Sequence, residues 1–85
     1  MVVLNMWYTY ILKSQATEWY YVGSTNDLEY RLRIHNNHKV RSTKHYAPLI
    51  LVYRVEWETE EEARSYERKI KKQRMLKESI LRGLK

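Results

Sequence analysis

The chain contains no cysteine, and this absence constrains its fold more than any other single feature of the sequence. It excludes disulfides, cysteine-bound zinc, iron–sulfur clusters and catalysis by a thiolate. A chain of 85 residues buries only ~60–65% of the surface that it exposes when unfolded. Stability must therefore come from one hydrophobic core, and we expect residues 1–85 to form a single domain.

Two aromatic-rich segments near the N-terminus predict a β-hairpin. Residues 6–12 and 19–22 combine aromatic with β-branched side chains, which is typical of strands. Residues 14–17 form a polar loop between them. The strand pairs that this loop implies are Lys13 with Glu18 and Tyr10 with Tyr21. Any loop with an even number of residues leaves the two tyrosines on one face of the hairpin, because successive side chains alternate between faces.

A helix and a basic loop are expected after the hairpin, whose second strand should end at Gly23. Asn26 and Glu29 have the spacing of a capping box, so we expect a helix whose apolar side holds Leu28 and Leu32. Residues 38–47 are polar and basic, and they predict a loop.

The second half of the chain predicts one strand followed by helices. Residues 49–57 alternate apolar and charged side chains in their later part, which indicates a strand with one buried face. The run from Thr59 to Glu62 is a clear capping box with acids in the first turn, and residues 68–72 supply the basic end that suits the helix dipole. Residues 75–84 predict a further helix.

Glu67 is the acidic residue whose position is most informative. It falls within the helical stripe formed by Ala63, Tyr66 and Ile70, which should face the core. A carboxylate there needs a cation, because an isolated buried charge is very costly. Two interpretations are open: a structural ion pair with a lysine or arginine, or a ligand for Mg²⁺, which often uses only one or two protein carboxylates.

Arg31 and His35 lie four residues apart, on one side of the first helix. A guanidinium can clamp a phosphate with two parallel hydrogen bonds, and a neutral imidazole can move protons near neutral pH. The alternative is an ordinary solvated basic face. A zinc site at His35 and His38 is disfavoured, because structural zinc takes four ligands and the chain has only 3 histidines.

The charge distribution is compatible with a nucleic-acid partner. The net charge is +6 and the isoelectric point is near 9.7, with basic segments at 28–49 and 68–85 on either side of an acidic segment at 56–67. A basic surface that serves only solubility is the alternative. No apolar run approaches the ~20 residues of a membrane span, and the N-terminus does not resemble a signal peptide. We therefore expect a cytoplasmic protein.

The ordered set of these residues resembles the GIY-YIG nuclease family over about residues 7–81. Tyr8-Thr9-Tyr10 and Tyr21-Val22-Gly23 stand where the family has its two short motifs. Arg31 matches the family arginine ten residues after the second motif's tyrosine, and His35 follows four residues later. Glu67 matches the metal-binding glutamate.

The resemblance implies an α+β fold in which helices flank a three-stranded antiparallel sheet. It also implies hydrolysis of DNA phosphodiester bonds with Mg²⁺ or Mn²⁺. Glu67 would hold the metal, and Arg31 would stabilise charge on the phosphate. Tyr21 or Tyr10 would activate or orient the attacking water, with His35 as a competing base.

Two departures from the family pattern leave alternatives open. No asparagine follows Asn37, although many active members carry one in the last helix, and Ser24 stands where the excision-repair nuclease has a lysine. The chain would then be a non-catalytic nucleic-acid-binding module, or a subunit that needs a partner protein for targeting. We expect duplex or branched DNA as the partner. For the endonuclease we expect structure-selective or weakly sequence-specific cleavage, with a role in repair or recombination. The basic residues expected to contact it are Lys39, Arg41, Lys44, Arg68 and Lys71, of which Lys44 is the nearest substitute for the missing lysine.

Overall fold

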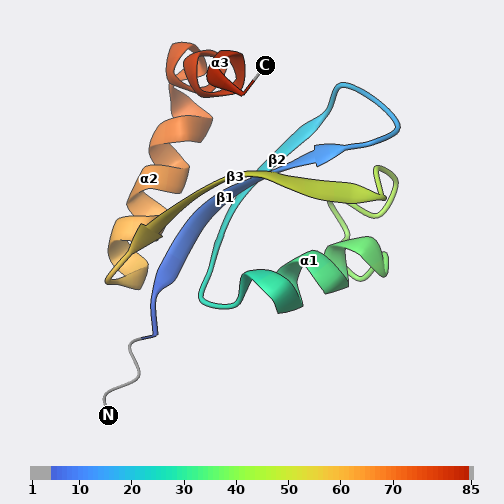
Figure 1. The fold of residues 1–85 in the computed structure, drawn as a ribbon, viewed down its shortest axis with the longest axis horizontal. Helices are drawn as coiled ribbons and strands as arrows, with labels where there is room; N and C mark the ends of the chain where they lie inside the picture. Colours follow the sequence, from blue (N-terminus) through green and yellow to red (C-terminus); the bar gives the residue numbers. More distant parts are fainter. Residues whose placement is uncertain (1–4, 85) are drawn as a thin grey trace.

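A computed structural model describes residues 5–84 and has the expected α+β architecture (Figure 1). The elements, in chain order, are β1 (Trp7–Ser14), β2 (Tyr20–Thr25), α1 (Leu28–Asn36), β3 (Leu49–Trp57), α2 (Glu60–Lys72) and α3 (Arg74–Gly83). The three strands form an antiparallel sheet in the order β2-β1-β3, so β1 is the central strand. No helix within this described part of the chain has the length and apolar character needed to span a bilayer.

The helices cover opposite faces of the sheet, as Figure 1 shows. Successive residues of β1 therefore enter different parts of the core. Tyr10 and Leu12 pack on the side of α1, whereas Ile11 and Val22 pack against Ile70 of α2 on the other side. Each face buries a small apolar cluster.

The predicted hairpin register is wrong by two residues, but the predicted face is correct. The observed pairs are Lys13 with Tyr20, Leu12 with Tyr21 and Tyr10 with Gly23. A shift of two residues leaves every side chain on its original face. Tyr10 and Tyr21 are consequently diagonal neighbours on the α1 face, with their ring centroids 6.2 Å apart.

The wider hairpin loop has a tertiary cause. The indole of Trp19 stacks on the ring of Tyr46, with centroids 3.8 Å apart and planes inclined by 4°. The backbone N–H of Ser14 then donates to the carbonyl of Trp19 at 2.9 Å, and the hydroxyl of Ser14 donates to the carbonyl of Tyr46 at 2.8 Å. These contacts draw Trp19 into the loop and out of the strand that the aromatic pattern predicted.

The ends of β2 and α1 also differ slightly from prediction. β2 continues past Gly23 to Thr25, and the helix is capped by Asp27 rather than Asn26. The carboxylate of Asp27 accepts from the N–H of Tyr30 at 3.0 Å. The hydroxyl of Thr25 accepts from the N–H of Asp27 at 3.0 Å, which fixes the turn from strand to helix.

The second half of the chain agrees closely with prediction. β3 spans the expected residues, and its register shift opposite Ile11 and Leu12 leaves Val52 as an extra residue. The predicted cap at Thr59 is confirmed, because its hydroxyl accepts from the N–H of Glu62 at 3.2 Å; the Glu62 carboxylate accepts from the Thr59 hydroxyl at 3.0 Å. The helical segment breaks at Gln73, which separates α2 from α3.

Candidate functional site

Three of the predicted site residues, Tyr21, Arg31 and Glu67, line a pocket of about 310 Å³ at the outer edge of β2. α1 reaches this edge from one face of the sheet and α2 reaches it from the other. The residues that line the pocket are Trp7, Tyr21, Gly23, Ser24, Thr25, Arg31, Arg64 and Glu67. The pocket therefore holds one phenol, two guanidinium groups and one carboxylate.

Gly23 allows the two tyrosines to pack closely at this edge. A Cβ atom at Gly23 would lie 2.5 Å from the hydroxyl oxygen and 2.6 Å from Cζ of Tyr10, and 3.0 Å from Cε1 of Tyr21. Real Cβ atoms do not approach other atoms so closely. The missing side chain thus makes room for the Tyr10 ring against the backbone of β2, while Tyr21 faces the pocket.

Tyr10 and His35 form a buried chain of hydrogen bonds behind the pocket. Both side chains are 0% exposed. Nδ1 of His35 lies 2.8 Å from the hydroxyl of Thr43, which itself donates to the carbonyl of Val40. Thr43 therefore accepts from Nδ1–H, and Nε2 of His35 accepts the hydroxyl proton of Tyr10 across 3.3 Å.

Burial keeps both of these groups neutral at physiological pH. Burial, with a smaller contribution from the Arg31 charge, lowers the pKa of His35 to about 4. Burial also raises the pKa of Tyr10 to about 12, against the opposing influence of Arg31. Neither side chain reaches the pocket surface, so both position their neighbours and do not meet a ligand directly.

Arg31 brings a positive charge without a protein counter-ion. Burial alone would disfavour its charged form, but the hydroxyls of Tyr10 and Tyr21 outweigh this effect, and the pKa of Arg31 is raised. Among residues 5–84, no carboxylate pairs with it, and its buried Nε has no hydrogen-bond partner. A charged guanidinium that lines a pocket and has no carboxylate partner is suited to an anion such as phosphate.

Among the described residues that line the pocket, Glu67 supplies the only carboxylate. Its side chain is 18% exposed; Oε1 accepts from the hydroxyl of Ser24 at 2.5 Å, and Oε2 pairs with Nζ of Lys71 at 2.6 Å. The predicted need for a cation is confirmed by Lys71. The polar contacts of α2 with the sheet place this carboxylate, since the carbonyl of Ala63 accepts from Thr9 at 2.7 Å.

Comparison with models of known protein families identifies the family of this chain. The model of the GIY-YIG catalytic domain matches residues 6–78. The chain belongs to the GIY-YIG family. It is also similar to the solution NMR structure of the UPF0213 protein BH0048 from Bacillus halodurans, with 30% identity and a TM-score of 0.55 over 94% of this chain and 85% of that chain. A search of curated proteins found no significant match.

The zinc alternative finds no support in this GIY-YIG domain. Nδ1 of His35 is engaged by Thr43, and Nδ1 of His38 lies 2.7 Å from the carbonyl of Lys44. Within the described residues, no three histidine, cysteine or acidic side chains gather around a common point.

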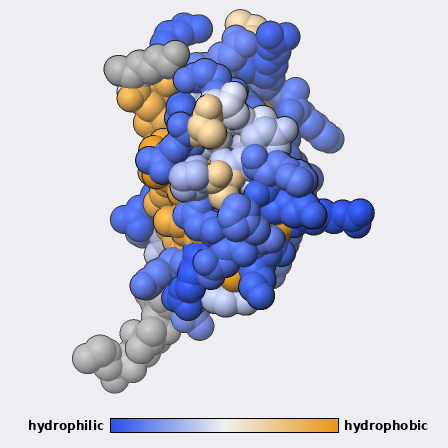
Figure 2. All heavy atoms as spheres, turned by 90° about the vertical axis from the view of Figure 1, so that its right-hand side faces the viewer, coloured by the Kyte–Doolittle hydropathy of each residue, from blue (hydrophilic) through white to orange (hydrophobic). Residues whose placement is uncertain are grey.

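The predicted DNA-contacting residues lie in three different places. Lys71 lies beside the pocket through its contact with Glu67, whereas Lys39, Arg41 and Lys44 lie in the exposed loop between α1 and β3. This loop and the hairpin turn are on the side shown in Figure 2, where most side chains are hydrophilic. Arg68 is exposed on α2 and does not line the pocket.

Several pocket residues were not predicted from the sequence. Arg64 lies three residues before Glu67 on the same side of α2, and its guanidinium carbon is 5.8 Å from the ring centroid of Trp7. The spacing of three within a helix was the signal that could have identified Arg64. Trp7 and Thr25 carried no comparable signal, because only the strand register brings them to this edge.

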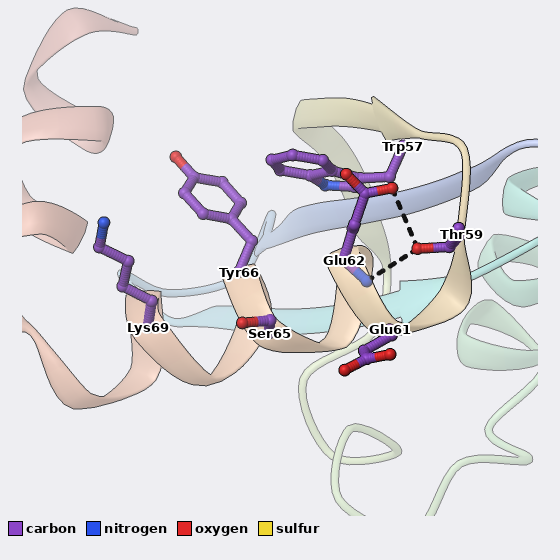
Figure 3. A pocket seen from close by; sticks show the side chains of 7 residues that line it. All are labelled: Trp57, Thr59, Glu61, Glu62, Ser65, Tyr66 and Lys69. Carbon is purple, nitrogen blue, oxygen red and sulfur yellow. Dashed lines mark hydrogen bonds between the residues drawn. The ribbon is translucent and has the colours of Figure 1, made fainter.

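A second hollow, of about 360 Å³, lies along the other side of α2 (Figure 3). Trp57 and Tyr66 form its aromatic wall, and their ring centroids are 5.5 Å apart. Glu61 and Glu62 stand at one end, which makes that end unfavourable for a phosphate. None of the predicted site residues lines this hollow, so the pocket at β2 is the functional site that we consider.

Proposed function

We propose that this GIY-YIG protein is a divalent-metal-dependent endonuclease that hydrolyses DNA phosphodiester bonds. The observation that carries the proposal is the joint presence, in one pocket, of an arginine without a counter-ion and a half-buried carboxylate. A phosphodiester would supply the negatively charged partner that Arg31 does not have among the described residues. Glu67 brings an oxygen ligand to the same space.

The residues present fit Mg²⁺ or Mn²⁺ as the metal. Glu67 would hold the ion, since Mg²⁺ is commonly bound through one or two carboxylates together with water and substrate phosphate. When bound, the ion supplies positive charge that stabilises the leaving oxygen of the phosphodiester. The hydroxyl of Ser24 fixes the orientation of the Glu67 carboxylate from the side of the sheet.

The protein side chains have different roles in the hydrolysis. In this reaction, the oxygen of a water molecule forms a new bond to phosphorus and the bond from phosphorus to the leaving oxygen breaks. One water proton passes to the solvent, and the leaving oxygen takes up a proton from the solvent. Arg31 holds the phosphate and offsets the charge that builds on it. Tyr21 lines the pocket and orients the water, whereas the buried pair of Tyr10 and His35 keeps Tyr21 in place.

The basic surface supports DNA as the substrate class. The net charge of +6 favours phosphate-rich partners, and Lys39, Arg41 and Lys44 form an exposed basic loop. We propose duplex or branched DNA, cut with structure selectivity or weak sequence preference in repair or recombination. A partner protein that directs the enzyme to its target stays a prediction.

A cleavage assay with matched variants tests the proposal. Supercoiled plasmid and labelled branched or flapped duplexes would be incubated with Mg²⁺, Mn²⁺ or EDTA. We expect metal-dependent cutting that falls by about 100-fold or more in Glu67→Gln and Arg31→Met, the usual scale for losing one transition-state contact. Glu61→Gln and Arg33→Met, which change exposed residues of the same two helices, should cut like the parent. Undiminished cutting by the Glu67 and Arg31 variants would refute the assigned site.

One observation favours a second function, a binding module without catalysis. Both oxygens of the Glu67 carboxylate already have partners, Ser24 and Lys71. If these contacts are permanent, DNA should bind in a salt-dependent manner that neither EDTA nor Glu67→Gln weakens. Electrophoretic mobility shifts at two salt concentrations, combined with the cleavage assay, distinguish the two functions.

A further inference from the structure

Lys71 closes the exposed side of the Glu67 carboxylate. It follows Glu67 by one helical turn, and its Nζ lies 2.6 Å from Oε2 of Glu67 and 6.0 Å from the ring centroid of Tyr21. The Lys71 side chain is 50% exposed, while that of Glu67 is 18% exposed. The ammonium thus contacts the carboxylate and belongs to the more exposed side chain of the pair.

The two oxygens of this carboxylate are held in different ways. Oε1 is fixed by Ser24, which belongs to the sheet, whereas Oε2 is held only by the flexible side chain of Lys71. A lysine side chain carries a strongly hydrated ammonium group on a flexible four-carbon stem, so the ammonium can leave such a contact readily. Ion pairs of this kind on helix surfaces are weak. Oε2 is therefore the oxygen that can change partners.

We propose that Lys71 competes with the divalent metal ion for Glu67. The ammonium occupies the carboxylate in the metal-free protein and moves away when the ion binds, because two cations cannot share one oxygen without strong repulsion. This inference rests on the proposed function, in which Glu67 holds the metal. It predicts that the site binds metal more weakly than its carboxylate alone would allow.

Measurement of Mn²⁺ binding without DNA tests this competition separately from activity. Mn²⁺ broadens nearby NMR signals, so titrating the 85-residue chain and following the Ser24 and Glu67 amide signals reports binding at this site. Lys71→Met should lower the Kd for Mn²⁺ by about five-fold, which is about 1 kcal/mol at 1.4 kcal/mol per factor of ten. Lys71→Gln, a polar replacement, should behave in the same way. Lys72→Met is the matched control, since Lys72 is exposed on the same helix and has no contact with Glu67.

The outcomes separate this inference from the proposed function. Tighter binding in both Lys71 variants, with Lys72→Met unchanged, would support the competition. If Glu67→Gln abolishes the broadening but the Lys71 variants bind Mn²⁺ like the parent, the competition is refuted and Glu67 is still the metal ligand. Equal tightening in the Lys71 and Lys72 variants would indicate a general charge effect and would also refute it. If Glu67→Gln leaves the broadening unchanged, both the proposed metal site at Glu67 and the proposed competition are refuted.

Discussion

Protonation of His35 should destabilise this protein at acidic pH by a predictable amount. The ring is fully buried, both of its nitrogens are engaged, and Nε2 accepts the hydroxyl proton of Tyr10. A proton on Nε2 would break that bond and place a positive charge near Arg31. Burial, with a smaller contribution from the Arg31 charge, is the physical reason that the pKa of His35 is lowered to about 4 in the fold.

The direction of the effect follows from proton uptake by the two states. The unfolded chain takes up a proton at His35 near pH 6.5, the ordinary histidine value, while the folded chain does so only near pH 4. As the pH falls through this interval, the unfolded state gains stability and the folded state does not. Each pH unit corresponds to 1.36 kcal/mol, so the full interval is worth about 3 kcal/mol. Solvent and salt in the open pocket near Arg31 screen part of this electrostatic free energy. We therefore expect a loss of about 2 kcal/mol in unfolding free energy between pH 7 and pH 4.5.

Urea unfolding of the parent and of His35→Gln across this pH range isolates the effect. The carboxylates titrate in both proteins, but only the parent carries the buried imidazole. The difference in unfolding free energy between parent and variant should therefore shrink by about 2 kcal/mol from pH 7 to pH 4.5. An NMR titration of the His35 ring provides the independent value, with an expected midpoint near 4. A difference that is constant with pH, or a midpoint near the ordinary value, would refute this account of the site.

Three further substitutions test the packing around the site, each by urea unfolding. Gly23→Ala should cost about 1–3 kcal/mol, because its methyl group would lie 2.5 Å from the Tyr10 hydroxyl, and unchanged stability would contradict the packing. Tyr10→Phe should also cost about 1–3 kcal/mol, because it leaves Nε2 of His35 without a donor. It should also reduce the cost of Gly23→Ala, because the hydroxyl that the new methyl group would meet is gone. Additive costs in the double variant would show that the two sites are uncoupled. Thr59→Ala should cost about 1 kcal/mol through loss of the cap of α2 while DNA cleavage is retained, and a loss of cleavage would connect this cap to the site.

Local patterns in the sequence predicted most of the fold. The alternation of β3 and the helix cap at Thr59 depend on neighbouring residues, and both appear as expected. The hairpin register depends on the stacking of Trp19 with Tyr46, which lies after α1 in the sequence. No pattern within the hairpin itself could indicate that contact, so the register was wrong while the shared face of the tyrosines was right.

The sequence identified the main residues of the site but not their different exposures. Tyr10 and Tyr21 look equivalent as strand tyrosines, yet Tyr10 is fully buried and Tyr21 lines the pocket. The difference arises because Gly23 faces Tyr10 across the strands and accepts its ring against the backbone. Similarly, helical spacing indicated that Glu67 needs a cation, but only the packed structure identifies Lys71 as that cation.

The order of the strands explains how such a small chain brings these groups together. Arg31 comes from the helix on one face of the sheet and Glu67 from the helix on the other, and both line the pocket at β2. A sheet separates groups on its two faces, except at an outer strand, where side chains from both sides can reach around the edge. β2 is such a strand because the central position belongs to β1. Gly23 and Ser24 of β2 face opposite sides of the sheet. Gly23 leaves room for the ring of Tyr10 on the α1 side, and the hydroxyl of Ser24 donates to the carboxylate of Glu67 on α2. The edge strand is therefore the element on which the whole site depends, and changes within β2 should disturb both halves of the site together.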